Sequence, residues 1–410
     1  MKSLILGGSP LLLPLLIVLV LLPMLATDIY LPAISSMGVE LSASHSDLML
    51  TLASYMVGYS LSLLLAGIFA DIYGRRVVVL WGILIFCLAS LASCFASSVE
   101  YLTLLRFCQA LGGGCTTLLA RVIVRDLFDF NSQVRVLSYL ATALVLSPIL
   151  GPIVGAYLTV EYGWRSVFYV LTAFSSLTLC LVFFLLNESL DREFIKPSFS
   201  IFDLMKRYFG LLKHYEFTFH TLVISFAWSV YFSFISSSPG LLQVLYELSP
   251  LEYGFLFSST ISGYIFGTVF IRRKINKTEI KDLILFAALS IFVSTISLLI
   301  FSAMRYDSLY LLLPCVFLAL FGVGIIFPAT QAGVTRSFTT NIGSISGLFY
   351  SVEMMFGAIC SFILSRLSEP SWTSTAFLML CCAFIILALS TFDKYLRSGF
   401  ANHLIKKGLK

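Results

Sequence analysis

The sequence predicts an all-α membrane protein of twelve transmembrane helices in two pseudo-symmetric six-helix bundles. Only 11% of the 410 residues are charged, 59% are hydrophobic, and the mean hydropathy is +0.98, whereas soluble domains carry about 25% charged residues. Apolar runs of about 20 residues, long enough to cross a bilayer as helices, follow one another along the chain. The longest polar interval divides these runs six and six, as in two-bundle secondary transporters.

The predicted spans leave little chain outside the membrane. They cover residues 10–33, 48–70, 77–97, 102–123, 134–158, 166–186, 217–242, 253–271, 283–303, 309–330, 342–365 and 373–392. This gives a first bundle at 1–186, a cytoplasmic linker at 187–216, a second bundle at 217–392 and a basic tail at 393–410. Apolar residues alternate with cations in the linker, which indicates either a helix on the membrane face or a solvated tether.

The cations fix the predicted orientation. All but four of the 26 lysines and arginines fall on one side of the predicted membrane, and that side is cytoplasmic by the positive-inside rule. Arg165, Arg305 and Arg366 lie on the other side, and Arg106 lies inside a span. Both termini are therefore expected in the cytoplasm. A net charge of +5 spread in this way needs no nucleic-acid partner.

Metal, cofactor and enzyme chemistry are not expected. All nine cysteines lie within predicted spans, where they behave as small apolar residues. The four histidines are scattered, and neither a zinc motif nor a catalytic dyad is visible. We expect no cofactor and no enzymatic activity.

A charged turn separates the second and third spans, at Gly67-Ile-Phe-Ala-Asp71-Ile-Tyr-Gly74-Arg75-Arg76. Asp71 can face a helix N-terminus and an arginine, and we expect it near Asn341, Gly343 and Arg121. Gly67 permits close approach of another helix, and Arg75 is expected to pair with Asp126 or Asp129. The run resembles the loop 2–3 motif of the major facilitator superfamily, which implies a gate on the cytoplasmic side. Its expected residues are Gly67, Asp71, Gly74, Arg75, Arg76, Arg121 and Asp126.

The fourth span holds Arg106 and Gln109, similar to the Arg-x-x-Gln-Gly motif of the same superfamily. A cation at the centre of a helix costs about 2.5 to 3.5 kcal/mol on insertion. We therefore expect Arg106 to face the bundle interior, beside a carboxylate or a polar cavity. The alternative is that Arg106 extends to the outer membrane face.

The fifth span contains Gly151-Pro152-Ile-Val-Gly155, preceded by Ser147 and followed by Ala156. Small residues and proline permit close packing and a bend. The Gly-Pro-x-x-Gly core resembles a motif of superfamily exporters, although Ser147 and Ala156 stand where the fuller pattern has glycines. The resemblance implies export.

Two acids inside spans are candidates for proton coupling, since burial favours the neutral form of a carboxylic acid. Asp28 lies near the outer end of the first span and Glu353 in the middle of the eleventh. Asp28 can instead cap the outer end of its helix. Glu353 can titrate, pair with Arg106, bind a cationic substrate, or serve a structural role at a helix interface.

The run Thr27-Asp28-Ile-Tyr30-Leu-Pro-Ala33 resembles the Bcr/CflA drug-resistance exporters, as do Gly163-Trp164-Arg165 and Phe234–Pro239. This resemblance implies a monomeric proton antiporter of a bacterial inner membrane that exports small hydrophobic compounds. Its partners would be protons, a small-molecule substrate and the lipid bilayer. A proton symporter that imports a metabolite or siderophore is the alternative. The expected substrate cavity includes Tyr30, Arg106, Gln109, Tyr231 and Phe232.

Overall fold

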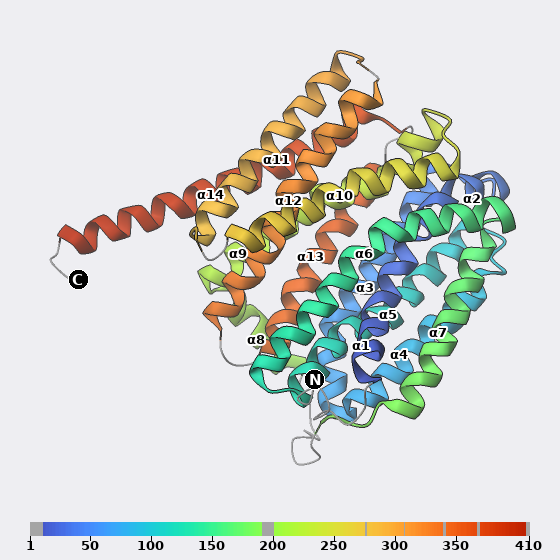
Figure 1. The fold of residues 1–410 in the computed structure, drawn as a ribbon, viewed down its shortest axis with the longest axis horizontal. Coiled ribbons are helices and arrows are strands. Elements are labelled where there is room, and N and C mark those ends of the chain that lie inside the picture. Colours follow the sequence, from blue (N-terminus) through green and yellow to red (C-terminus); the bar gives the residue numbers. More distant parts are fainter. Residues whose placement is uncertain are drawn as a thin grey trace. The chain divides into compact units, whose positions relative to one another are not determined.

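The computed structural model describes residues 11–190, 201–274, 277–306, 308–338, 342–366 and 370–406, which are almost wholly helical. The first part of the chain forms α1 (Leu12–Asp28), the short turn η2 (Leu31–Ala33), α2 (Ile34–Glu40), α3 (His45–Tyr73), α4 (Arg75–Ser93), α5 (Val99–Leu127), α6 (Phe130–Tyr162) and α7 (Arg165–Leu185) (Figure 1). It continues as α8 (Ile201–Leu212), α9 (Tyr215–Ser238), the π-helical turn η4 (Pro239–Val244), α10 (Pro250–Lys274), α11 (Ile280–Ala303), α12 (Leu309–Ser337), α13 (Ile342–Ser365) and α14 (Trp372–Lys406).

Twelve helices are long and apolar enough to cross a membrane, which confirms the predicted number. The first of them is longer than expected and ends at Glu40 rather than at residue 33. Pro32 lies in the tight turn η2, where its fixed φ and missing N–H are tolerated. The chain therefore remains helical through the proline and continues directly into α2.

Local signals in the sequence explain where several helices begin. Ser44 and Asp47 form a reciprocal capping box at the start of α3. The Ser98 hydroxyl accepts a hydrogen bond from the N–H of Tyr101 at the start of α5. Gly74 separates α3 from α4 with a φ of +93°, a conformation that glycine adopts without steric cost.

The helices group into two compact units that differ from the two halves of the sequence. Unit 1 comprises Met1–Gly210, Ile235–Ser259 and Asn341–Pro370; unit 2 comprises Leu211–Phe234, Thr260–Thr340 and Ser371–Lys410. Thus η4, the first part of α10 and α13 group with the amino-terminal helices. The two sequence bundles, the linker and the tail remain predictions, and residues 191–200 and 407–410 of the latter two lie outside the described residues.

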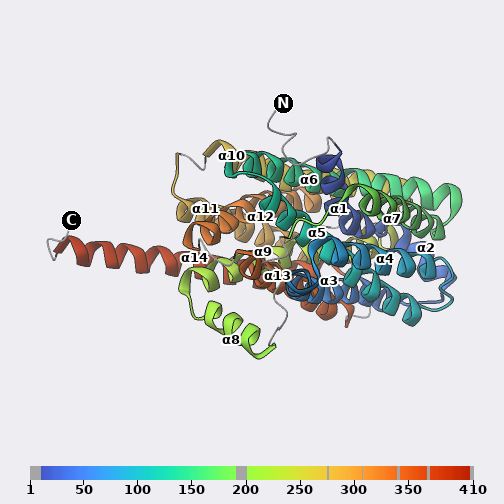
Figure 2. The ribbon, with the colours of Figure 1, turned by 90° about the horizontal axis from the view of Figure 1, so that it is seen from below.

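Unit 1 has α3 at its centre, between α5 and α13, while α4 packs on α5 and α7 (Figure 2). Small polar residues join α3 to α13. The Ser60 hydroxyl donates to the Ser351 carbonyl oxygen at 2.8 Å, and the Ser361 hydroxyl donates to the Met49 carbonyl at 3.2 Å. Their small side chains permit close helix contact in a membrane.

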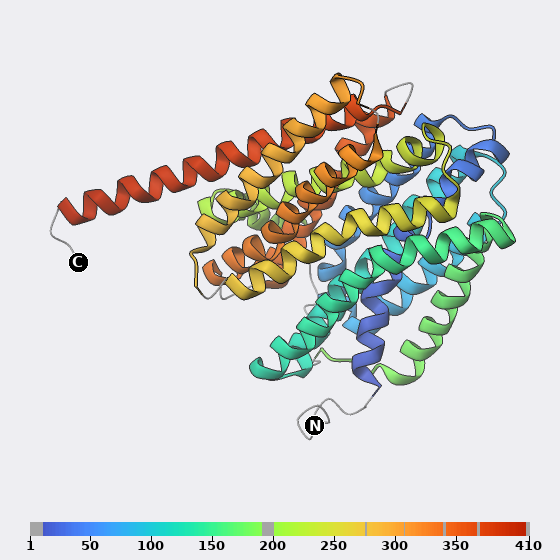
Figure 3. The same ribbon diagram turned by 45° about the horizontal axis from the view of Figure 1, so that its top comes forward.

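Unit 2 is built on α11, which packs against α12 and α14. Lys394 pairs with Asp282 at 3.1 Å, and the Tyr215 hydroxyl donates to Asp393 at 3.0 Å. The end of α14 runs on past the other helices of its unit (Figure 3). Helix α8, within the predicted linker, contacts unit 1 through Tyr208, whose hydroxyl donates to the Leu64 carbonyl at 3.3 Å. Burial there raises the pKa of Tyr208 to about 12.

Candidate functional site

Asp28, the last residue of α1, is buried inside unit 1. Its side chain is part of a residue that is only 6% exposed, so it is not an interfacial cap. The hydroxyl of Ser147, on α6, donates a hydrogen bond to Asp28 Oδ2 at 2.6 Å. Ser147 is itself buried. A neutral hydroxyl is thus the hydrogen-bond partner of this acid.

The glycines of the fifth span hold Asp28 in place. A Cβ at Gly151 would lie 2.5 Å from the Cβ of Asp28. A Cβ at Gly155 would lie 2.8 Å and 2.9 Å from the carbonyl carbon and Cα of Ile29. The predicted close packing of this motif is confirmed, and its partner is α1. Pro148 and Pro152 lie on the same stretch of α6, so the exporter-like motif and the buried acid form a single contact.

Arg106 is fully buried, which excludes the alternative that it extends to the membrane face. Its guanidinium lies between two aromatic rings, 4.4 Å from the centroid of Tyr30 and 4.1 Å from that of Tyr55. Arg106 Nη1 donates to the Ala26 carbonyl at 3.0 Å and to Gln109 Oε1 at 2.6 Å. Cation–π attraction and these two acceptors replace the expected carboxylate.

The surroundings of Arg106 are polar and fully packed. Gln109 Nε2 donates to the Ser90 hydroxyl at 2.8 Å, and the hydroxyls of Tyr30 and Thr51 are 2.6 Å apart. Within the described ranges, Arg106 Nε and Nη2 have no acceptor. The candidate cavity residues Tyr30, Arg106 and Gln109 therefore form one cluster between α1, α3 and α5.

Glu353 faces a different arginine from the one expected. It is 1% exposed, and the cation that acts on it is Arg121, not Arg106. The two arginines are 15 residues apart on α5, which corresponds to about 22 Å along a helix. The Arg121 guanidinium lies 4.6 Å from the ring of Tyr350, three residues before Glu353 on α13. The expected pairing of Glu353 with Arg106 is wrong because α13 meets α5 near its far end.

The turn between α3 and α4 forms the predicted ion-pair cluster. Arg75 Nε donates to Asp126 Oδ2 at 3.2 Å, and Arg75 also pairs with Asp71. The predicted pairing of Arg75 with Asp126 is confirmed. Arg121 lies beside Tyr350 rather than serving Asp71 as the described partner.

Two expectations for this turn are not decided. The expected contact of Asp71 with Asn341 and Gly343 falls outside the described residues. At Gly67 the nearest described atom to an added Cβ is Leu118 Cδ2 at 3.8 Å, an ordinary contact. Arg76 donates from Nη2 to the carbonyl of Phe183 at 2.7 Å, which joins the turn to α7.

Glu188, just after α7, was not predicted as part of this cluster. Its two carboxylate oxygens accept from the backbone N–H groups of Arg75 at 2.8 Å and Arg76 at 3.1 Å. A negative charge there stabilises the N-terminus of α4. An added Cβ at Gly74 would lie 2.9 Å from Glu188 Cδ, so glycine serves both the turn and the carboxylate. An acid that directly follows a span was the available signal.

A second cluster lies at the opposite end of the same helices. Trp164 Nε1 donates to Glu40 Oε2 at 2.7 Å, and Arg165 pairs with the other oxygen of Glu40. Arg165 Nε also donates to the Cys94 carbonyl at 3.1 Å. The Trp-Arg pair before α7 thus binds the end of α2, which the sequence did not reveal.

The aromatic residues of α9 belong to unit 2. Tyr231 is 7% exposed and Phe232 is fully buried, so these two candidate cavity residues present little surface. Trp228 stacks on both of them, with ring centroids 5.1 Å and 5.8 Å away. The half-buried rings of this cluster are those of Trp228, Tyr264 and Phe327.

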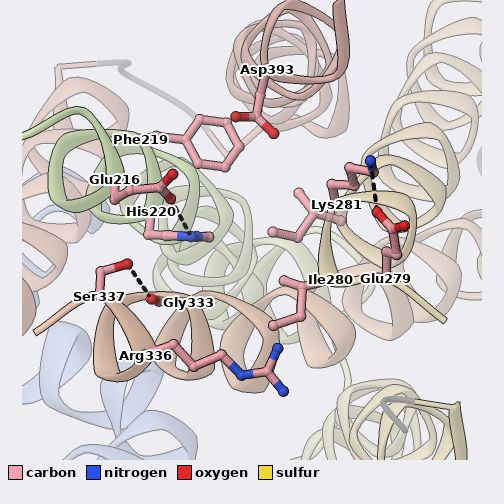
Figure 4. A pocket seen from close by; sticks show the side chains of 11 residues that line it. Glu216, Phe219, His220, Glu279, Ile280, Lys281, Gly333, Arg336, Ser337 and Asp393 are labelled. Atoms are coloured by element: carbon pink, nitrogen blue, oxygen red, sulfur yellow. Dashed lines mark hydrogen bonds and ion pairs between the residues drawn. The ribbon is translucent and has the colours of Figure 1, made fainter. Parts of the chain in front are cut away.

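Unit 2 also contains a polar pocket of about 370 Å³ that was not predicted (Figure 4). His220 Nε2 lies 3.6 Å from Glu216, and Lys281 pairs with Glu279 at 2.6 Å. Among the residues that the structure describes, no group of histidine, cysteine, aspartate or glutamate could hold a metal ion.

Comparisons with known proteins identify the family. The model of the Major Facilitator Superfamily matches residues 16–359. A "Bicyclomycin resistance protein homolog" of Haemophilus influenzae is 26% identical over 90% of this chain and 92% of its own length. A "Multidrug resistance protein MdtL" of Salmonella paratyphi C is 30% identical over 59% of this chain and 60% of its own length.

Solved structures agree on the fold. A D-xylose-proton symporter matches with a TM-score of 0.72 and 14% identity, over 92% of this chain and 97% of that one. A peptide transporter in complex with alafosfalin matches with a TM-score of 0.74 and 15% identity, over 94% and 95%. With twelve helices able to span a membrane and these relatives, this multi-pass membrane protein is a transporter, not an enzyme, and it belongs to the major facilitator superfamily.

Proposed function

We propose that this transporter is a proton-coupled antiporter that exports small hydrophobic compounds. It would lie in a bacterial inner membrane as a monomer, with both termini in the cytoplasm. The observation that carries the proposal is the burial of Asp28 against α6, where Ser147 is its hydrogen-bond partner. The named relatives with bicyclomycin and multidrug resistance support the choice of cargo.

The chemistry of Ser147 suits an acid that gains and loses a proton. A hydroxyl can donate to a carboxylate and can also accept from a carboxylic acid. Both protonation states of Asp28 therefore keep a hydrogen bond, and neither leaves a buried polar atom without a partner. An arginine partner would serve the charged state alone.

The contact between Asp28 and α6 supplies a route from proton to conformation. Because Gly151 and Gly155 lie against Asp28 and Ile29, a change of charge at Asp28 acts directly on the packing of α1 and α6. In the proposed cycle, Asp28 releases its proton to the cytoplasm, substrate binds, and protonation from outside favours release. Each ligand must bind the two states unequally for this coupling to work.

Glu353 is a second candidate for proton coupling. It is buried beside Arg121, and Arg121 lies on the last turns of α5, which also carry Asp126. In this proposal, Asp71, Gly74, Arg75, Arg76 and Asp126 form the cytoplasmic gate with Glu188. Their ion pairs would hold the α3–α4 turn in one of the two states.

The test measures proton movement in proteoliposomes that contain the purified protein. Hydrophobic antibiotics are added to wild type, to Asp28→Asn and to Glu100→Gln, which removes an exposed acid of α5. We expect antiport-directed proton flux in wild type and in Glu100→Gln, and none in Asp28→Asn. Flux in the symport direction would favour the importer instead. Full coupling in Asp28→Asn would reject Asp28 and make Glu353→Gln the next variant.

A further inference from the structure

Five aromatic rings from three helices of unit 2 meet around Trp228. On α9, Trp228 stacks on Tyr231 at 5.1 Å and on Phe232 at 5.8 Å. Phe327 of α12 lies 5.8 Å from Trp228. Tyr264 of α10 lies 5.7 Å from Tyr231 and 5.6 Å from Phe327. We refer to Trp228, Tyr231, Phe232, Tyr264 and Phe327 as the aromatic cluster.

The cluster has a buried side and an accessible side. Phe232 is fully buried and Tyr231 nearly so, and they support the indole from beneath. Trp228, Tyr264 and Phe327 are only half-buried. Because aromatic rings prefer offset-stacked or edge-to-face contacts, these three rings suit a flat aromatic ligand.

Trp228 also carries an unused hydrogen-bond donor. Its indole Nε1 is buried, and no acceptor for it exists among the described residues. A buried N–H without an acceptor is costly, and tryptophan indoles usually find a partner when buried. A ligand with an acceptor at its edge would supply the missing partner.

The cluster also lies at a depth that suits a transport site. Trp228 follows the start of α9 by 13 residues, or about 20 Å of helix. Tyr264 and Phe327 each precede the end of their helix by 10 residues, or about 15 Å. With a hydrocarbon core of about 30 Å, all three rings lie near the middle of the membrane, where transporters of this type bind substrate.

We propose that the aromatic cluster binds planar aromatic compounds that carry a hydrogen-bond acceptor, such as a ring nitrogen or carbonyl oxygen. The acceptor receives the Trp228 N–H, and the plane of the compound packs on Trp228, Tyr264 and Phe327. This inference rests on the proposed function for its biological meaning, since it names the class of compound exported. The binding itself can be measured without transport.

The experiment compares two compounds of nearly identical shape. Equilibrium dialysis on protein in nanodiscs measures the binding of a quinoline, which has a ring nitrogen, and of the naphthalene with the same substituents, which has none. Trp228→Phe keeps a stacking ring and removes the donor; Trp228→Ala removes both. Trp372→Phe is the control, because the Trp372 indole N–H also has no described acceptor but does not belong to the aromatic cluster.

We expect Trp228→Phe to weaken quinoline binding about 2- to 10-fold and to leave naphthalene binding unchanged. Trp228→Ala should weaken both by about 10-fold, and Trp372→Phe should change neither. Equal loss of both compounds in Trp228→Phe, unchanged binding in Trp228→Ala, or no binding to wild type would each overturn the proposal. Melting temperatures of all variants show whether the fold is kept.

The outcomes also separate this site from the proposed function. If the binding pattern appears but no compound drives proton movement, the aromatic cluster stands and the antiport proposal fails. If quinolines drive antiport equally in wild type and in Trp228→Ala, antiport stands and the aromatic cluster is ordinary packing. Both measurements use the full chain.

Discussion

The contact of α6 with α1 makes a quantitative prediction for Gly155→Ala. The new methyl group would lie 2.8 Å and 2.9 Å from the carbonyl carbon and Cα of Ile29. Non-bonded carbon atoms prefer about 3.5 to 4.0 Å. The obstructing atoms belong to the backbone, so no side-chain rotation can relieve the contact. The two helices must separate by about 1 Å, at an overpacking cost of about 1 to 3 kcal/mol.

The same separation reaches the proposed proton site. Asp28 precedes Ile29, and its bond from Ser147 is 2.6 Å long. A shift of about 1 Å would lengthen that bond beyond the usual range for O–H···O pairs. We therefore expect Gly155→Ala to lower the melting temperature of the purified protein and to reduce substrate-driven proton flux in proteoliposomes.

Gly210→Ala is the matched control, because nothing lies within 4 Å of an added Cβ at that position of α8. Alanine is also the better helix former. The control should melt and transport like wild type. If Gly155→Ala behaves in the same way as Gly210→Ala, α1 does not rest on the glycines of α6, and the argument that links Asp28 to conformation fails.

Three further predictions concern unit 1. Glu188→Gln should lower the melting temperature, because the N-terminus of α4 loses a charged cap worth about 0.3 to 1 kcal/mol; an unchanged value would reject the cap. A double-mutant cycle of Arg75→Gln and Asp126→Asn in thermal unfolding should give a coupling of about 1 kcal/mol, and additive effects would contradict the ion pair. Glu353→Gln should destabilise by about 3 kcal/mol, since it leaves Arg121 without a compensating charge. Restoration of stability in a Glu353→Gln variant that also carries Arg121→Gln would confirm the pairing, and no restoration would refute it.

The sequence predicts the membrane helices well because their causes are local. Composition and length determine which segments can span a bilayer, and all twelve are found. Residues close to one turn are equally accessible, and the pairing of Arg75 with Asp126 was predicted for that reason. Its extension to Glu188 was missed because the acid lies in another segment, which looks like the beginning of a linker.

Pairings inside the bundle could not be predicted because they depend on which helices pack together and at what height. Arg106 was expected beside a carboxylate, yet two tyrosine rings and a carbonyl surround it. Neither rings nor carbonyls leave a charge pattern in the sequence. Glu353 meets Arg121 rather than Arg106 because the height at which α13 packs decides the partner.

The two buried acids differ in a way that assigns them different parts in the proposed cycle. Adding a proton to Asp28 leaves Ser147 able to hydrogen-bond, so the site tolerates either state at little cost. Adding a proton to Glu353 leaves the charge of Arg121 uncompensated beside Tyr350, so the same event there disturbs the contact of α5 with α13. Asp28 is thus suited to carry protons in every cycle. Glu353 is suited to hold α13 in place, and its protonation would release that helix rather than serve as the routine step.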